Sequence, residues 1–444
     1  MMKTHSRIAA LAGLAIAAAC GGTRSADISV PDEALPPGIA VASFDSLWKI
    51  VADTYVDTAF VSSRWVTVRD SLRPRALTIT RRRELDALLG ETLNTISDSH
   101  FYIIPERLAP ADSGSKSDGR GATGLVVRVA EGRAVAWRVN PGSPAERAGI
   151  RPGQTVVRVG SRDPAEALDR LEAMPDQAKP RALYEALQRL NGALAPRVGD
   201  TVAVVMRADG KTVTHRLVAV QAEGRLSQYA NLPPIAGVVN WSRLPVQGGG
   251  CAGTIAFNIW LPAFVGELDR AVDSVRSCKG VVIDLRGNPG GVGAMVMGFG
   301  GHFVDSVKSL GTMKMRQLSL NFVINPQRSR NDGSSMSPFS GPVAILVDPM
   351  TASTSEIFAA GMQRIGRARV FGQRSAGAAL PALMNRLPSG DVFVHAVADF
   401  TDPEGRRIEG SGAEPDVEVP LSVGVLSEGR DGPLEEALLW IGGQ

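Results

Sequence analysis

Ser353 stands at a junction where a serine can act as a nucleophile. It follows the apolar run PVAILVD, which predicts a buried strand, and it opens STSEIFAAGM, which predicts a helix to about Ile365. Free N–H groups and the positive dipole end at a helix start stabilise negative charge developing on a substrate oxygen. Ser353 and Glu356 also match an S-x-x-E capping box, which is a structural device, and this segment alone favours the cap.

A second segment suited to chemistry is DLRGNPGG, from Asp284 to Gly291, which ends a predicted strand. Its three glycines and one proline predict a tight loop whose backbone N–H groups converge on one point, as an oxyanion hole requires. Glycine-rich turns after strands are common, and this one lacks the spacing and the Lys-Ser/Thr pair of a phosphate-binding loop. The loop therefore does not identify a reaction by itself.

Three segments in a fixed order resemble the active-site regions of the C-terminal processing (tail-specific) peptidases and of the tricorn core protease. They are DLRGNPGG, TASTSEIF and EGSGAEPDV, and they follow a PDZ-like stretch. The resemblance extends over most of the chain beyond its first 40 residues. It implies a crotonase-like protease core and a serine-type endopeptidase with Ser353 as nucleophile. It implies no metal or cofactor.

The resembled family has two catalytic solutions, and the sequence distinguishes them. Tail-specific enzymes use a lysine to take the serine proton; here GQRSAGAAL places Ala378 at that position, and Arg364 stands where those enzymes have an aspartate. A serine-lysine dyad at the usual place is therefore excluded. The tricorn-like solution uses a Ser-His pair from a preceding domain and a late glutamate, which correspond to Ser99, His100 and Glu409.

The resemblance thus implies a relay in which His100 takes the proton of Ser353 and passes it to the leaving amine. Imidazole suits this role because its unperturbed pKa of about 6.5 leaves it mostly neutral at physiological pH. Glu409, through Ser99 or directly, would orient the base. The alternatives are an ordinary histidine at a strand start and a solvated acid in a turn.

The oxyanion donors follow from the same resemblance. They would be the backbone N–H of Gly290 or Gly291 together with that of Thr354. Thr354 replaces an aspartate with which tricorn selects basic residues, so that preference is not carried over.

The chain of 444 residues is too long for one hydrophobic core. Residues 235–444 contain two strand-helix-strand passages, TIAFNIW to VVIDLR and PVAILVD to ARVFG, which predict a parallel sheet covered by helices. Apolar residues at helical spacing predict a small helical domain over residues 41–112. The fold class is therefore α/β and multidomain.

Residues 113–222 resemble the PDZ domains of bacterial envelope proteases. GLVVRV and AVAWRV predict a hairpin, Ser143 to Gly149 a short helix, and residues 201–220 a closing hairpin, with a helical insertion at 163–198. Such domains add a peptide as an extra strand and hold its carboxylate on backbone N–H groups. The alternative is a β-domain that packs on the protease and binds nothing. The resemblance assigns peptide binding to Thr123, Gly124, Leu125 and Val126.

Residues 1–20 are typical of a secretory leader, because Lys3 and Arg7 precede an apolar run at 8–19 that is too short to span a bilayer. AAAC resembles a bacterial lipobox, which would lipidate Cys20; cleavage without a lipid is the alternative. We expect export to the periplasm or cell envelope, a linker at 21–40, and membrane contact only through a lipid anchor.

Export permits disulfides, and Cys251 and Cys278 each precede a β-branched run. If those runs are neighbouring parallel strands, the two sulfurs lie side by side. The sequence favours a disulfide over two buried thiols.

A net charge of +3 with no Lys/Arg-rich run excludes nucleic acid as a partner and leaves polypeptide substrates. The sequence does not predict an oligomeric state. The competing hypothesis is a catalytically inactive peptide-binding adaptor. A third, acyl-CoA chemistry on the crotonase fold, conflicts with export away from CoA.

Overall fold

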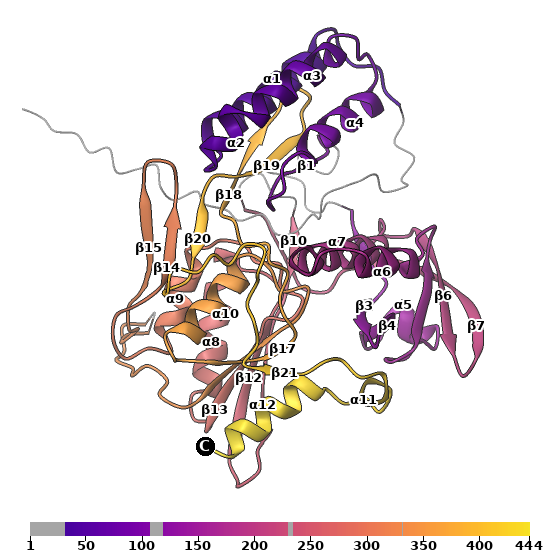
Figure 1. Cartoon of the computed structure of the whole chain (residues 1–444). Coiled ribbons are helices and arrows are strands. Elements are labelled where there is room, and N and C mark those ends of the chain that lie inside the picture. The colour runs from indigo at the N-terminus through magenta and orange to yellow at the C-terminus, as the bar shows by residue number, and fades with distance from the viewer. Residues whose placement is uncertain (1–31, 107–118, 230–233, 331) are drawn as a thin grey trace, which may run out of the picture.

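The computed structural model describes residues 32–106, 119–229, 234–330 and 332–444, and its elements form three groups (Figure 1). The predicted leader, Cys20 and the first part of the linker lie outside the described residues, as does the predicted boundary between residues 112 and 113. No helix within the described ranges is both long and apolar enough to cross a membrane.

The largest group is built on a six-stranded sheet. Neighbouring strands from the second to the sixth are parallel, and the first is antiparallel to the second. In spatial order the strands are β11 (Val239–Pro245), β12 (Cys251–Phe257), β13 (Gly280–Asp284), β16 (Val343–Val347), β17 (Arg369–Gly372) and β21 (Val417–Glu418).

Helices cover both faces of this sheet (Figure 1). One face packs against α8 (Val265–Val275), α9 (Met295–Gly301) and α10 (Thr354–Arg364). The other packs against α12 (Gly432–Gly442). Strands β12, β13 and β16 alternate side chains between the two apolar layers, so each reads as an unbroken apolar run. This confirms the α/β multidomain prediction.

The disulfide lies at the start of β12. Cys251 and Cys278 are bonded, with their Cα atoms 4.9 Å apart. Parallel pairing of β12 with β13 brings the two residues together, since Ala252 lies opposite Gly280.

The N-terminal helical group consists of α1 (Ile39–Thr54), α2 (Thr58–Ser62), α3 (Arg64–Ala76) and α4 (Arg82–Leu93). Its core includes Phe44, Leu47 and Trp65, none of which is exposed. A hairpin from far along the chain, β18 (Ala382–Arg386) and β19 (Val392–Ala396), reaches into this group and pairs with β1 (Tyr102–Ile104) (Figure 1). Leu387 and Phe393 of that hairpin complete the helical core.

The third group is a five-stranded antiparallel sheet with three helices. The strands, in spatial and chain order, are β3 (Leu125–Ala130), β4 (Arg133–Val139), β5 (Thr155–Val159), β6 (Thr201–Ala208) and β7 (Lys211–Val218). The helices are α5 (Pro144–Arg147), α6 (Pro164–Glu172) and α7 (Lys179–Ala193). β3 is an edge strand, so its outer side pairs with no other strand of this sheet.

Shorter elements connect these groups. A hairpin, β14 (Lys308–Lys314) and β15 (Ser319–Ile324), pairs with β20 (Asp399–Thr401). Two small pairs join β2 (Gly121–Ala122) to β8 (Val220–Gln221) and β9 (Arg225–Ser227) to β10 (Ile235–Gly237). Helix α11 (Val423–Ser427) packs near β4.

Candidate active site

Ser353 lies between β16 and α10 in a strained conformation. Its φ of 57° and ψ of −122° are unusual for a residue other than glycine, and such strain costs about 1–3 kcal/mol. The residue is fully buried, and its Oγ has no hydrogen-bond partner among the described residues. The Ser353 N–H donates to Glu356 Oε2 at 2.8 Å, as in a capping box, whereas Ser353 Oγ makes no hydrogen bond within the described residues. The cap alone therefore does not explain this serine.

Glu356 fixes the loop that faces the serine. Besides the Ser353 N–H, its carboxylate accepts hydrogen bonds from Ser375 Oγ at 2.6 Å and from the N–H groups of Gly377 and Ala378 at 2.7 and 3.0 Å. Burial raises its pKa to about 7, although these hydrogen bonds oppose the shift. Sequence reasoning assigned Glu356 only to a cap and missed this second role, which depends on residues 19 to 22 positions later.

The glycine loop packs directly on the nucleophile. A Cβ at Gly290 would lie 2.7 Å from Ser353 Cβ, so only glycine fits there. The Gly290 N–H is already used, since it donates to Asn288 Oδ1 at 3.0 Å. In the described part of the chain, no acceptor is bonded to the N–H groups of Gly291 or Thr354, and Thr354 Oγ1 donates to the Gly291 carbonyl at 2.9 Å. Of the two glycines predicted as oxyanion donors, only Gly291 therefore has a backbone N–H without an acceptor in the described residues.

Ser99, His100 and Glu409 form a hydrogen-bonded chain. Ser99 Oγ donates to Glu409 Oε2 at 2.9 Å and lies 2.7 Å from His100 Nδ1. Two backbone N–H groups fix the carboxylate, that of Ser99 at 2.7 Å and that of Ala379 at 2.8 Å. Because the Ser99 proton points at a carboxylate, its oxygen must accept from Nδ1–H. The imidazole proton is thus on Nδ1, and Nε2 is left as the proton acceptor.

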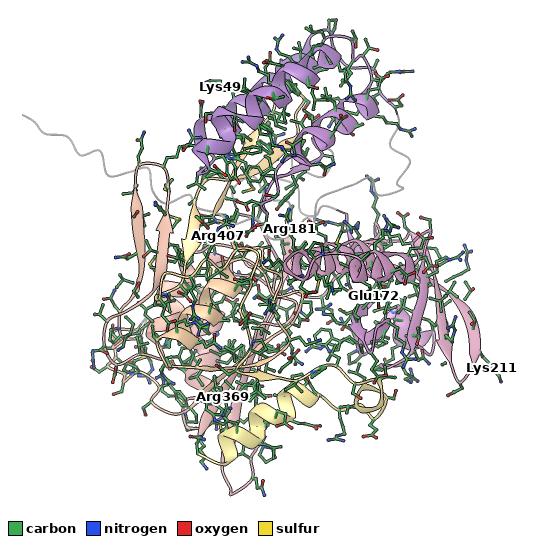
Figure 2. All side chains as sticks on the ribbon, in the orientation of Figure 1. Lys49, Glu172, Arg181, Lys211, Arg369 and Arg407 are labelled. Atoms are coloured by element: carbon green, nitrogen blue, oxygen red, sulfur yellow. A yellow bond between two sulfur atoms is a disulfide. The ribbon has the colours of Figure 1, made fainter. Side chains whose placement is uncertain are left out.

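Burial and charge keep this imidazole neutral. Desolvation, followed by the positive charge of Arg181, lowers the pKa of His100 to about 3. Burial raises the pKa of Glu409, against the hydrogen bonds from Ser99 and Ala379. Arg181 comes from α7 and donates to the Ser97 carbonyl, and Arg407 pairs with the adjacent Asp98; both arginines are labelled in Figure 2.

The segment 378–379 connects the two halves of the site. The Ser353 N–H donates to the Ala378 carbonyl at 2.9 Å, and the next N–H, that of Ala379, binds Glu409. The predicted hydrogen bond between His100 and Ser353 Oγ is not formed, since that oxygen has no partner among the described residues. The structure therefore brings the predicted residues into one neighbourhood without the direct contact.

The position of the tail-specific lysine holds no base. Ala378 contributes only backbone atoms, and Arg364 bonds Asp402 at 3.2 Å. Within the described ranges, no group of three or more His, Cys, Asp or Glu side chains is arranged to hold a metal ion.

The predicted peptide-binding residues lie at the start of β3. The Thr123 N–H and Oγ1 both donate to the Leu194 carbonyl, at 3.3 and 2.9 Å, so neither is free for a carboxylate. A Cβ at Gly124 would collide with Ser143, and Leu125 and Val126 pair with β4. The open side of β3 is occupied by a side chain that the sequence did not indicate, Asn191 of α7.

Asn191 binds β3 as a neighbouring strand would. Its Oδ1 accepts from the Val127 N–H at 2.8 Å, and its Nδ2 donates to the Val127 carbonyl at 3.1 Å. A side-chain amide thus satisfies both backbone groups of one edge residue, which an added peptide strand would otherwise do.

Comparisons with known protein families match parts of the group built on the six-stranded sheet and of the N-terminal helical group. The model of peptidase family S41 matches residues 256–419, and that of the tricorn protease C1 domain matches residues 42–94. The chain is similar, in both regions, to the C-terminal processing and tricorn-like serine peptidases. Ser353 and Glu409 lie within the first match, whereas Ser99 and His100 lie outside both.

Curated relatives agree along most of the chain. A carboxyl-terminal-processing protease of Picosynechococcus is 27% identical over 84% of this chain and 81% of its own length. The chloroplastic carboxyl-terminal-processing peptidase 3 of Arabidopsis thaliana is 24% identical over 84% of this chain and 67% of its own.

Solved structures share the fold. The photosystem II D1 C-terminal processing protease aligns with a TM-score of 0.57 at 22% identity, covering 91% of this chain and 97% of its own. The tricorn protease aligns at 0.50 and 15% identity, covering 91% of this chain and 36% of its own.

Proposed function

We propose that this peptidase is an endopeptidase in which Ser353 Oγ attacks the scissile carbonyl and His100 Nε2 takes its proton. The imidazolium then gives the proton to the leaving amine. The observation on which the proposal rests is the order of hydrogen bonds from Glu409 through Ser99 to Nδ1, because it leaves Nε2 able to accept a proton. Glu409 acts as the orienting group and stabilises the imidazolium.

The oxyanion would be bound by Gly291 and Thr354. Their N–H groups flank the nucleophile, one on the glycine loop and one on the first turn of α10, where the helix dipole adds positive potential. The unpartnered Oγ of Ser353 is consistent with this role, because a reacting group must be free of structural hydrogen bonds. Proton transfer needs a movement that brings Oγ within hydrogen-bond distance of Nε2, and such contacts often tighten only with substrate.

We infer the class of substrate from the β3 edge strand and from the similarity to C-terminal processing peptidases. An extended segment of an unfolded or tail-exposed polypeptide would suit both a serine peptidase site and strand addition at β3. We assign residues 113–222 as a PDZ-like module and residues 235–444 as a crotonase-like core. Residues 1–20, with Cys20 as the lipid acceptor, would export the protein to the periplasm or cell envelope.

One observation favours the competing adaptor hypothesis: Ser353 is buried and makes no hydrogen bond to His100. In that case the chain would bind peptides without cutting them. An activity-based serine probe separates the two hypotheses.

The test compares wild type with Ser353→Ala, using a fluorophosphonate probe and cleavage of an unfolded protein. We expect labelling and cleavage in wild type and neither in the variant. We also expect the variant to melt no lower than wild type, because it removes a buried hydroxyl that has no partner, whereas loss of a true cap would cost about 1 kcal/mol. A wild-type protein that neither labels nor cleaves would rule out the proposed endopeptidase.

A further inference from the structure

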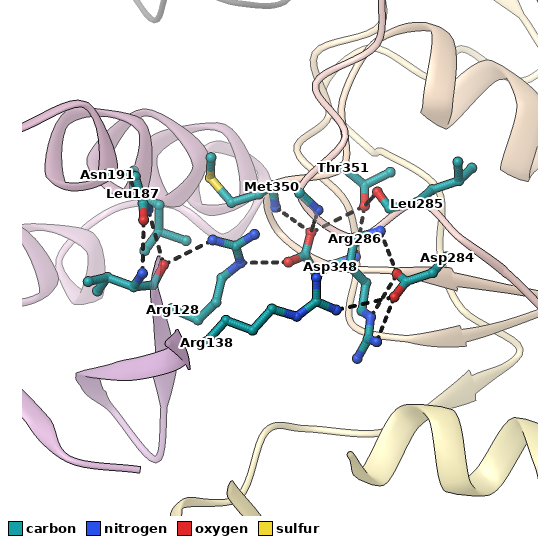
Figure 3. A network of polar contacts seen from close by, with 12 residues as sticks. Arg128, Arg138, Leu187, Asn191, Asp284, Leu285, Arg286, Asp348, Met350 and Thr351 are labelled. Carbon is teal, nitrogen blue, oxygen red and sulfur yellow. Dashed lines mark hydrogen bonds and ion pairs between the residues drawn. The ribbon is translucent and has the colours of Figure 1, made fainter. Parts of the chain in front are cut away.

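A buried ion pair joins the five-stranded sheet to the catalytic group. Arg128 of β3 donates from Nε to Asp348 Oδ2 at 2.6 Å, and both side chains are almost fully buried (Figure 3). Asp348 follows β16 directly, five positions before Ser353. The guanidinium also lies over the Trp137 ring, 4.5 Å from its centroid, which fixes its plane.

The other oxygen of Asp348 holds two loops together. Oδ1 accepts from the Gly287 N–H at 2.9 Å, from the Met350 N–H at 3.0 Å and from Thr351 Oγ1 at 3.2 Å (Figure 3). Gly287 belongs to the glycine loop, and the other two belong to the turn that leads to the nucleophile. One carboxylate therefore sets the spacing of the loops that contain the two proposed oxyanion donors.

Arg128 is in direct contact with this arrangement. A Cβ at Gly287 would lie 2.7 Å from Arg128 Nη2, so the guanidinium rests against the glycine loop itself. Without the arginine, a buried carboxylate would keep only neutral donors, which leaves its charge poorly compensated. The carboxylate would then shift or take up water, and the loops would move with it.

We infer that Arg128 is a positioning residue for the reaction: through Asp348 it fixes the distance between the Gly291 and Thr354 N–H groups. This inference rests on the proposed function of those two donors. Because Arg128 lies on the edge strand, and its Nη1 donates to the same Val127 carbonyl as Asn191, at 3.0 Å, the contact also links that edge to the oxyanion site.

The experiment measures the rate at which the fluorophosphonate probe labels Ser353, a reaction in which Oγ displaces fluoride from phosphorus, together with kcat and KM for a short peptide. We expect Arg128→Met to slow labelling and lower kcat by about 10- to 100-fold, below the loss of about 10²- to 10³-fold seen when a whole oxyanion donor is deleted. KM should change less than about threefold, because the donors act on the transition state.

The matched control is Arg138→Met. Arg138 also pairs with an aspartate across this interface, Asp284 at 3.4 Å. Its side chain is 49% exposed, however, and the ion pair of Asp348 is with Arg128. We expect the labelling rate of Arg138→Met to stay within about twofold of wild type. Equal losses in both variants, or unchanged labelling of Arg128→Met, would overturn the inference.

A second variant tests the inference if Arg128→Met does not fold. The double change Arg128→Met with Asp348→Asn removes both charges and so avoids a buried unpaired carboxylate. We expect a folded protein that the probe still labels at least about tenfold more slowly than wild type, since a neutral amide holds the loops less firmly. Labelling at the wild-type rate would show that the pair is only structural. Absence of labelling in wild type would instead refute the proposed function.

Discussion

Glu409→Gln is the sharpest test of the relay, because the two side chains have the same shape but opposite hydrogen-bonding needs. Oε1 accepts from the Ser99 N–H, and Oε2 accepts from the Ser99 hydroxyl and the Ala379 N–H. A glutamine must turn its NH₂ group toward one of these positions. In either orientation one backbone N–H faces another donor.

The two orientations have different consequences for the base. With NH₂ at the Oε2 position, the Ser99 hydroxyl must accept from it and donate to His100 Nδ1, which moves the imidazole proton to Nε2. That tautomer cannot take the serine proton, and the equivalent change in a Ser-His-Asp triad lowers kcat by about 10⁴. With NH₂ at the Oε1 position the tautomer survives, and the conflict with the Ser99 N–H costs about 1–3 kcal/mol of stability.

We therefore expect Glu409→Gln to lower kcat by about 10²- to 10⁴-fold, depending on how the two orientations are populated. The assay is steady-state cleavage of an unfolded protein, with thermal melting to measure the stability loss. Glu414→Gln is the matched control, since it is an exposed acid in the same segment that pairs with Arg374. Cleavage by Glu409→Gln within about threefold of the control would refute the relay.

Three further predictions follow from contacts described above. Arg181→Gln should raise the pKa of His100 by removing a nearby positive charge, so the acid limb of kcat/KM should move to higher pH; an unchanged limb would contradict this. Asn191→Ala should free the edge of β3 and tighten binding of a fluorescent peptide by about fivefold or more, at about 1 kcal/mol per hydrogen bond; weaker binding would place the amide in the peptide site. Replacing Cys251 and Cys278 by serine should lower the free energy of unfolding in urea by about 3.5 kcal/mol for this loop, an effect that reductant should reproduce in wild type.

Sequence patterns predicted those parts of the candidate site that are formed by a single continuous segment. The strand-to-helix junction at Ser353 and the glycine loop before Gly291 were readable because turn and helix signals are local. The disulfide followed from two strand starts once the strands were taken as parallel neighbours. The catalytic roles of His100 and Glu409 stay predictions.

Contacts between distant segments were not readable. Nothing in residues 382–396 indicates that their hairpin completes the core of the helical group, since that packing depends on tertiary context. Two hydrogen bonds each depend on one side chain and leave no periodic pattern in the sequence. They are the bond from the Gly290 N–H to Asn288 and the bond from the Val127 N–H of β3 to Asn191. The missing contact between His100 and Ser353 likewise depends on how separate groups are docked.

The helical group and the proposed relay both depend on residues from late in the chain. Ser99 and Glu409 are 310 positions apart, so a nascent chain leaving the ribosome presents the imidazole long before its carboxylate partner exists. The helical group also lacks Leu387 and Phe393 until late in translation. Under the proposed relay, a polypeptide that ends before Glu409 would be inactive, and removal of the late hairpin would leave the core of the helical group incomplete.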